Sequence, residues 1–135
     1  MSPLLEMILR FLLAVALGAG IGFQRERAGK AAGLRTHILV SSGAALFTLV
    51  SIYGFGDAEV DISRVAAGVV LGIGFIGAGV ILRGQREKEV AGLTTAATIW
   101  MTAAVGLAAG TGMYLVSVIA TAVVVGILLL PKVRG

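Results

Sequence analysis

The side chains that could do chemistry in this chain gather at the ends of long apolar runs. They comprise one carboxylate, two guanidinium groups, one imidazole and four hydroxyls: Glu26, Arg27, Arg35, Thr36, His37, Thr94, Thr95 and Thr98. Polar and ionisable groups at the edge of a membrane-spanning segment usually face protein or a water-filled cavity, and they often carry function. These residues are therefore the candidates for a polar or cation-binding site.

Glu26 and His37 each leave two interpretations open. An acid near the end of a helix opposes the helix dipole, so Glu26 needs either a bound cation or a basic neighbour (Arg25, Arg27 or Arg35). His37 is either a functional group or a ring that is hydrogen-bonded to the backbone. With one histidine and no cysteine in the chain, a zinc-type site cannot be completed.

The threonines also have a structural interpretation beside the functional one. Thr36 is placed to cap the start of the second apolar run. Thr94, Thr98 and Thr102 follow one another at four-residue spacing, which puts them on one face of a helix. Their hydroxyls either bond back to their own helix, as threonines in membrane helices often do, or line a path or a seam between helices.

Acidic residues gather in the second loop, at Asp57, Glu59 and Asp61. Carboxylate oxygens suit Mg²⁺, so Asp57 and Asp61 join Glu26 as candidate metal ligands, and Mg²⁺ is the one cofactor that the sequence suggests. The plainer interpretation is that Asp61 or Ser63 caps the helix that follows. Near the N-terminus, Glu6 and Arg10 are spaced to pair on one helix face.

No motif predicts an enzyme. Residues 72–77 match the G-x-G-x-x-G pattern of dinucleotide-binding proteins, but that motif requires a strand-to-helix turn in a soluble fold, and here it lies inside an apolar run. The chain has no serine, histidine and acid set, no paired acids at catalytic spacing and no phosphate-binding loop. The glycines are better explained as helix-packing residues.

The composition predicts an all-α membrane protein. Of 135 residues, 58% are hydrophobic and 13% are charged, about half the charged fraction of a soluble domain. Five apolar runs, each close to the ~20 residues that cross a bilayer as helix, make up a single transmembrane domain over residues 1–135. The runs cover residues 4–23, 34–55, 65–82, 93–109 and 113–130.

The loops predict the orientation. The first and third loops and the tail carry nine of the eleven basic residues: Arg25, Arg27, Lys30, Arg35, Arg83, Arg86, Lys88, Lys132 and Arg134. Basic loops stay in the cytoplasm, which places the N-terminus outside and the C-terminus inside. The positive charge of the chain is thus explained by topology, and we expect a lipid bilayer, not nucleic acid, as its environment.

An internal repeat appears at an offset of 59 residues. Residues 18–36 and 77–95 align without a gap, and they share eight identities, including the Ala-Gly-Leu turns at 32–34 and 91–93. Two hairpins of the same orientation, helices 1–2 and 3–4, would be related by an axis along the membrane normal, as in transporters built from parallel repeats. The fifth helix is then an addition to the repeat.

Glycines predict the packed centre of the bundle. In lipid, close backbone approach at small residues is a main packing device. The candidates are Gly18, Gly22, Gly68, Gly72, Gly74, Gly77 and Gly79, with the densest set between residues 65 and 100. Because five short helices bury little surface alone, we also expect a homodimer.

Four segments resemble the MgtC/SapB family of bacterial inner-membrane proteins. They are Ile21-Gly-Phe-Gln-Arg-Glu-Arg27, Ala32-Gly-Leu-Arg-Thr-His37, Gly72-Ile-Gly-Phe-Ile-Gly-Ala-Gly79 and Gly92-Leu-Thr-Thr-Ala-Ala-Thr-Ile-Trp100. With the five-helix layout, the resemblance covers nearly the whole chain. Virulence-type members carry a soluble domain after the helices, so the resemblance is to the membrane module of that family.

The resemblance implies a role in magnesium homeostasis, in adaptation to low Mg²⁺ and in the virulence of intracellular pathogens. It also implies action on other membrane proteins, including inhibition of the ATP synthase. The first hypothesis is a regulatory membrane module that binds partner helices through its glycine faces. The alternative is a Mg²⁺ transporter or channel with a site between the two hairpins.

Overall fold

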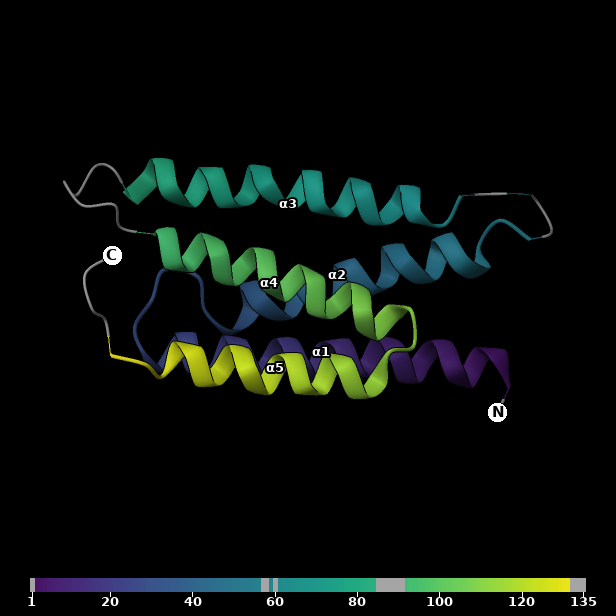
Figure 1. The fold of residues 1–135 in the computed structure, drawn as a ribbon, viewed down its shortest axis with the longest axis horizontal. Coiled ribbons are helices and arrows are strands. Elements are labelled where there is room, and N and C mark those ends of the chain that lie inside the picture. Colours follow the sequence, from purple (N-terminus) through teal and green to yellow (C-terminus); the bar gives the residue numbers. More distant parts are fainter. Residues whose placement is uncertain (1, 57–58, 60, 85–91, 132–135) are drawn as a thin grey trace.

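The computed structural model describes residues 2–56, 59, 61–84 and 92–131, and all regular structure in them is helical (Figure 1). The five predicted helices are all present, with bounds within a few residues of the apolar runs. They are α1 (Pro3–Arg27), α2 (Leu34–Tyr53), α3 (Ser63–Gly84), α4 (Leu93–Gly110) and α5 (Tyr114–Leu128).

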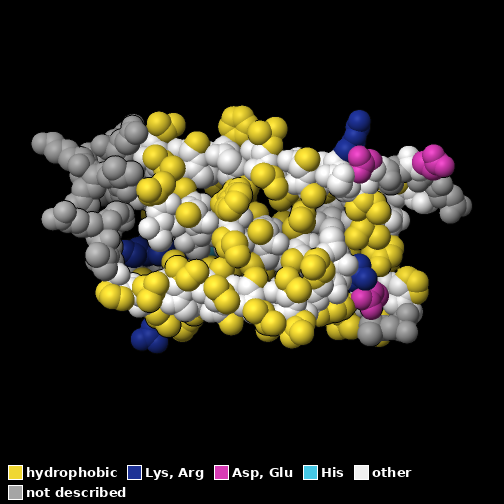
Figure 2. Space-filling view, viewed as in Figure 1, with side chains coloured by type: hydrophobic (Ala, Val, Ile, Leu, Met, Phe, Trp, Pro, Cys, Tyr) yellow, Lys and Arg dark blue, Asp and Glu magenta, His cyan; other side chains and the backbone are white. Residues whose placement is uncertain are grey.

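Four of the helices are long and apolar enough to cross a membrane, and α5 is shorter. With 15 residues, α5 is about 22 Å long at 1.5 Å per residue, less than a ~30 Å hydrocarbon core. Hydrophobic side chains cover the flank of the bundle seen in Figure 2, and the charged side chains on that face lie toward its two ends. This distribution is that of a multi-pass membrane protein.

The helix α4 is the centre of the bundle, because it packs against all four of the others. The helix α3 is the least buried of the four long helices, and it packs only against α4 and, over a small area, α2. In Figure 1 it accordingly forms the outer edge of the bundle.

The tightest packing joins α2 to α1 and to α4. A Cβ atom built on Gly18 of α1 would lie 2.6 Å from the His37 carbonyl oxygen, and one on Gly22 would lie 2.8 Å from the Leu34 Cα. On α4, a Cβ on Gly106 would overlap the Ser41 carbonyl oxygen, and one on Gly110 would lie 2.9 Å from the Thr48 Cβ. Only glycine permits these backbone approaches.

The glycines of α3 do not form the packed centre that the sequence predicts. A Cβ on Gly68, Gly72, Gly74 or Gly79 would have no heavy atom of the described residues within 4 Å, and one on Gly77 would make an ordinary 3.6 Å contact with the Ala96 Cβ. That prediction is wrong within a single copy of the chain. Spacing shows that a helix can be approached closely, but it does not say which helix approaches it.

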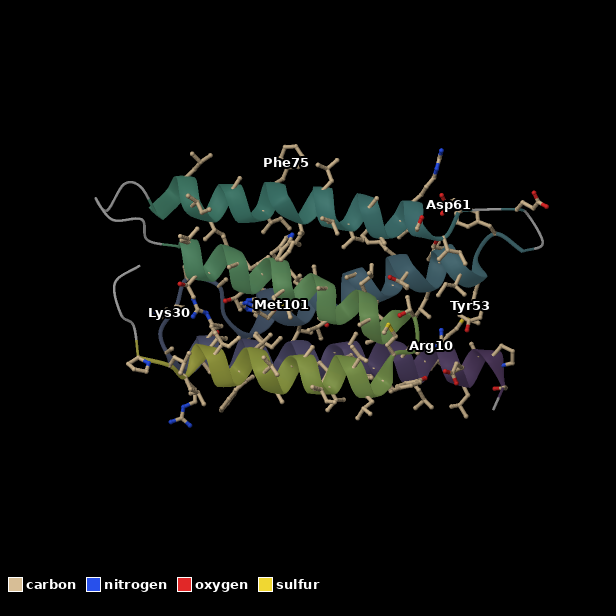
Figure 3. The ribbon with its side chains drawn as sticks, viewed as in Figure 1. Arg10, Lys30, Tyr53, Asp61, Phe75 and Met101 are labelled. Carbon is tan, nitrogen blue, oxygen red and sulfur yellow. The ribbon has the colours of Figure 1, made fainter. Side chains whose placement is uncertain are left out.

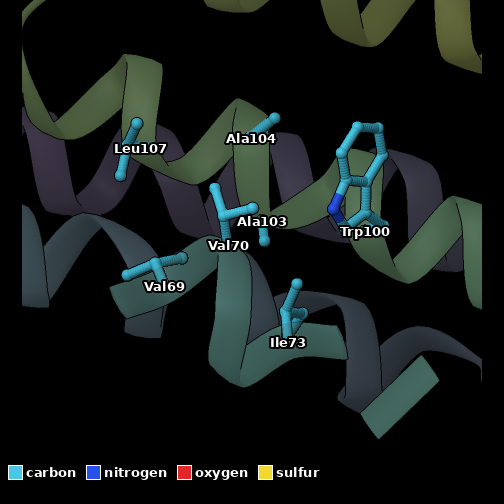
Figure 4. Close-up of a pocket in the computed structure, with 7 residues that line it drawn as sticks. All are labelled: Val69, Val70, Ile73, Trp100, Ala103, Ala104 and Leu107. Carbon is cyan, nitrogen blue, oxygen red and sulfur yellow. The ribbon is translucent and has the colours of Figure 1, made fainter. Parts of the chain in front are cut away.

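The seam between α3 and α4 is also looser than the others. A groove of about 80 Å³ lies there, and every residue along it is apolar (Figure 4): Val69, Val70, Ile73, Trp100, Ala103, Ala104 and Leu107. On the α4 side the lining includes two small residues, Ala103 and Ala104. The helix α3 is therefore held against α4 by fewer close contacts than join α1 to α2.

The predicted repeat has a counterpart in two contacts. Gly18 faces His37, and Gly77 faces Ala96, and each residue of the second pair lies 59 positions after its counterpart. The helices α2 and α4 also begin at the same end of the bundle. The symmetry axis and the membrane orientation stay predictions, since part of the basic loop and the tail, with Arg86, Lys88, Lys132 and Arg134, lies outside the described residues.

Candidate functional site

The interior of the bundle contains an arginine near the end where α1 finishes and α2 and α4 begin. Arg25 follows Gly18 and Gly22 on the face of α1 that packs against α2, and it is only 4% exposed. Its Nη2 donates a 2.6 Å hydrogen bond to the Thr95 hydroxyl of α4. Its Nε is buried and has no hydrogen-bond partner among the described residues. We call this end of the molecule the Arg25 end.

His37 lies within the first turn of α2 and is completely buried. Its Nδ1 is 2.8 Å from the Gly33 carbonyl oxygen, an atom that can only accept, so Nδ1 must carry a proton and donate. In the neutral ring, Nε2 is then a bare acceptor, and it has no partner in the described part of the chain. His37 is therefore hydrogen-bonded to backbone on one side and unsatisfied on the other.

The threonines of α4 divide into two groups. Thr98 donates to the Thr94 carbonyl oxygen and Thr102 donates to that of Thr98, both at 2.7 Å, so their hydroxyls are satisfied by their own helix. Thr95 is buried and accepts from Arg25, while Thr94 is exposed at the helix start. The buried threonines lie at the helix seam, but only Thr95 bonds to another helix.

Glu26 contacts the backbone at the start of α2. Its Oε1 accepts a 3.0 Å hydrogen bond from the backbone N–H of Leu34, so it satisfies a free donor at the start of α2. No ion pair joins it to Arg25, Arg27 or Arg35 in the described structure. The carboxylate caps the next helix, and the predicted pairing with a basic neighbour is wrong.

The remaining predicted residues do not join the interior cluster. Arg27 and Arg35 are exposed, and the Arg27 guanidinium lies 5.8 Å from the centre of the Phe23 ring. Thr36 is half-buried, and the start of α2 is capped by Glu26 and not by Thr36, so the predicted Thr36 cap is also wrong. Arg25 is missing from the predicted site, although its spacing from Gly18 and Gly22 indicates a buried face.

The candidate metal ligands do not come together. Asp61 accepts hydrogen bonds from the backbone N–H and the hydroxyl of Ser63, at 3.0 and 2.6 Å, and so acts at the start of α3 as predicted. Asp57 lies outside the described residues. No group of three possible ligand side chains occurs in the part searched. The interior of the Arg25 end does not fit Mg²⁺, because its charged group is a cation.

At the opposite end, Arg10 is fully engaged. Its Nε lies 3.0 Å from the Glu6 carboxylate, which confirms the pair predicted from the spacing, and its Nη1 donates to the Gly110 carbonyl oxygen at 3.2 Å. The Tyr114 hydroxyl donates to the same Glu6 oxygen at 2.6 Å. The guanidinium also lies 5.7 Å from the Tyr53 ring centre, and Figure 3 shows both residues at the end away from Lys30. This cluster ties α1 to α2, α4 and α5.

Comparison with known proteins places the chain in a family. The MgtC family model matches residues 11–134. Over 115 residues the chain is 52% identical to an Escherichia coli K12 protein named "Putative magnesium transporter YhiD", a match that covers 81% of this chain and 53% of that protein. It is 47% identical over 122 residues to protein SrpB of Synechococcus elongatus, covering 83% and 67%.

It is also 44% identical over 117 residues to protein MgtC of Salmonella typhimurium, covering 87% of this chain and 48% of that one. The chain thus spans about half the length of the YhiD and MgtC proteins that it matches. No solved structure matches it. The family match and the apolar helices agree, and the chain belongs to the MgtC family of multi-pass bacterial inner-membrane proteins.

Proposed function

We propose that this chain is a regulatory membrane module in magnesium homeostasis, which acts on other membrane proteins through helix contacts at α3. The observation that carries the proposal is the openness of α3. Within the chain, 6% of its apolar window is buried, against 56% in α4. A glycine-rich helix with so little of its own chain packed against it offers a surface for close approach by another helix.

The open surface of α3 has one large side chain among glycines. Gly68, Gly72, Phe75 and Gly79 follow one another at four- and three-residue spacing and so share a helix face. Phe75 is 78% exposed, and Figure 3 shows it directed away from the other helices. A ring flanked by flat glycine surfaces is self-complementary, which favours a two-fold homodimer in which each ring packs on the other copy's glycines.

The same face is suited to heterologous partners in the membrane. Among these, the ATP synthase is the target that the family resemblance implies. The homodimer and a complex with such a target would use one surface, so they compete. We therefore propose that the dimer is the resting form of the module.

Transport is the second candidate function, and the name of the YhiD protein favours it. The charges of the Arg25 end oppose it. Mg²⁺ passing between the hairpins would meet the buried Arg25 guanidinium, and charges of the same sign repel strongly where water is scarce. The Thr98 and Thr102 hydroxyls are occupied by their own helix.

Association at α3 is tested with Gly72→Leu in proteoliposomes, with energy transfer between labelled copies as the readout. A Cβ at position 72 meets no described atom within 4 Å inside the chain, so the fold is expected to persist while the dimer weakens at least about tenfold. Gly43→Leu on α2 is the matched control, because a Cβ there also meets nothing within 4 Å. Equal dimerisation by both variants would contradict the proposed surface.

Function is tested in two ways. The first measures Mg²⁺ flux into proteoliposomes, and the second measures growth at low Mg²⁺ of a bacterium that lacks its own MgtC-family protein and expresses this chain. We expect no flux above that of empty vesicles, and growth that Gly72→Leu abolishes but Gly43→Leu does not. Glu26→Gln keeps an oxygen for the Leu34 N–H and removes only the charge. Robust flux that this variant eliminates would overturn the regulatory role in favour of transport.

A further inference from the structure

The buried Arg25 and the half-buried Arg10 are satisfied very differently. Arg10 has a carboxylate, a backbone carbonyl and an aromatic ring around its guanidinium. Arg25 is 4% exposed, yet its one hydrogen bond goes to the neutral Thr95 hydroxyl, and its Nε has no acceptor in the described structure. A buried charge without an opposite charge or full hydrogen bonding is costly, and within the described residues the Arg25 guanidinium has no anionic partner.

The start of α4 adds to the positive potential around Arg25. Both α2, with 20 residues, and α4, with 18, begin at this end; the exposed Glu26 carboxylate caps the start of α2, while the N-cap residue of α4, Gly92, has no side chain to cap it. The N-terminus of a helix carries a partial positive charge and free N–H groups, which attract anions. Thr95 lies in the first turn of α4, and after accepting from Arg25 its hydroxyl still has a proton to donate.

His37 faces the same interior. The contacts of Gly18 with His37 and of Gly22 with Leu34 set α1 against the start of α2. Because helix side chains lean toward the N-terminus, Arg25 extends back along α1 toward this turn. The cluster thus presents donors from Arg25 and Thr95 beside a bare acceptor, the Nε2 of His37.

We infer that Arg25, Thr95 and His37 form a binding site for a phosphate group that also carries a hydroxyl. The charged phosphate oxygens accept from Arg25 and Thr95, and the hydroxyl of the ligand donates to the His37 Nε2. Arginine suits this role because its planar fork matches the oxygen pairs of phosphate. The site is independent of the proposed function, since it lies on α1, α2 and α4 and not on the open face of α3.

Two sources supply this chemistry. Arg25 lies two residues before the end of the α1 span, where we expect lipid headgroups, and phosphatidylglycerol offers a phosphate and glycerol hydroxyls there. Inorganic phosphate in solution offers an oxyanion and a P–OH group. Both place a negative oxygen and a hydroxyl on one small group, as the donors and the acceptor of the cluster require.

The first test follows the thermal stability of the full chain in an uncharged detergent as phosphate is added, with sulfate and chloride at matched ionic strength. We expect saturable stabilisation by phosphate, a weaker effect of sulfate, which carries no hydroxyl at neutral pH, and none from chloride. Arg25→Gln is expected to weaken the apparent phosphate affinity about tenfold or more. Arg27→Gln, with the same loss of charge at an exposed position, is expected to leave it unchanged.

The acceptor is tested by His37→Asn and His37→Gln. Asparagine retains a donor for the Gly33 carbonyl oxygen but removes the Nε2 acceptor, so it is expected to erase the preference for phosphate over sulfate. Glutamine places an oxygen near the Nε2 position, so it is expected to restore part of that preference. If Arg25→Gln fails to fold, Arg25→Lys keeps the charge and loses the fork, and it should bind phosphate more weakly than the unchanged chain.

The source is distinguished by adding phosphatidylglycerol or phosphatidylcholine to phosphate-free micelles. Arg25-dependent stabilisation by phosphatidylglycerol assigns the site to a headgroup, and stabilisation by free phosphate alone assigns it to a soluble anion. If neither stabilises the protein, or if chloride and the Arg27→Gln variant reproduce every effect, the site does not exist as inferred.

Discussion

The helices α3 and α4 run side by side, but they play opposite parts in the bundle. Both are apolar and contain several glycines, but more than half of the α4 window is buried and almost none of the α3 window is. The α4 glycines at 106 and 110 lie against the backbone or side chains of α2, whereas four of the α3 glycines face no described atom. The glycine content of a helix therefore indicates that another helix can pack closely against it. Whether one does depends on which helices are its neighbours in the bundle.

The largest effect that would test this comparison is Gly106→Ala. A Cβ there overlaps the Ser41 carbonyl oxygen and lies 2.8 Å from its carbonyl carbon, so the backbones of α2 and α4 must separate. We expect the free energy of unfolding to fall by about 1–3 kcal/mol, the usual cost of overpacking a close-packed interior. Reversible unfolding in mixed micelles, as the fraction of ionic detergent rises, measures it.

The matched control is Gly43→Ala on α2, where the added Cβ meets no described atom. It should leave stability unchanged or raise it slightly, because glycine costs backbone entropy in a helix. Equal destabilisation by both changes would show that the α2–α4 seam is no tighter than the open face of α2, and the comparison would fail.

Much of the fold could be predicted from the sequence because it follows from composition and length. Runs of about 20 apolar residues separated by charged or glycine-containing turns indicate helices, and all five are observed within a few residues of the predicted bounds. The pairing of helices could not be predicted in the same way. Gly18 and Gly22 have the same four-residue spacing as Gly68 and Gly72, but only the first pair meets another helix of this chain.

A smaller effect is expected from the hydrogen bond that joins the packed helices. The Ser41 hydroxyl of α2 is buried and donates to the Ala14 carbonyl oxygen of α1 at 2.8 Å. Ser41→Ala keeps the Cβ and removes this bond, so the free energy of unfolding should fall by about 1 kcal/mol, within the range measured between membrane helices. The same detergent titration measures it.

Ser42→Ala is the control, because the Ser42 hydroxyl reaches only the Leu39 carbonyl oxygen of its own helix, at 3.5 Å. It should change stability by less than Ser41→Ala. The reverse order would show that bonds between helices add nothing to the packed seam beyond the fit of small residues.

The candidate site could be predicted only in part, for a related reason. His37 and Thr95 are predictable because polar side chains at the edge of an apolar run are conspicuous. Arg25 is one of several basic residues around a predicted cytoplasmic loop, where topology alone explains such residues. Its distinguishing feature is its register with Gly18 and Gly22, and this register matters only once those glycines are known to face α2.

The smallest effect is expected on α3 itself. Here the comparison predicts that replacing a glycine raises the free energy of unfolding, the opposite of the effect expected on α4. Gly72→Ala adds a methyl group that meets no described atom, so nothing inside the chain opposes it. Removing the entropic cost of glycine in a helix should raise the free energy of unfolding of the dilute monomer by about 0.5–1 kcal/mol. The same methyl group should weaken association at high protein density in the membrane, because it keeps a second helix from the flat glycine surface. Stability measured at low protein-to-detergent ratio and energy transfer measured in vesicles separate the two effects. Loss of stability in the dilute monomer would mean that α3 is packed by its own chain after all, and that its difference from α4 is one of degree.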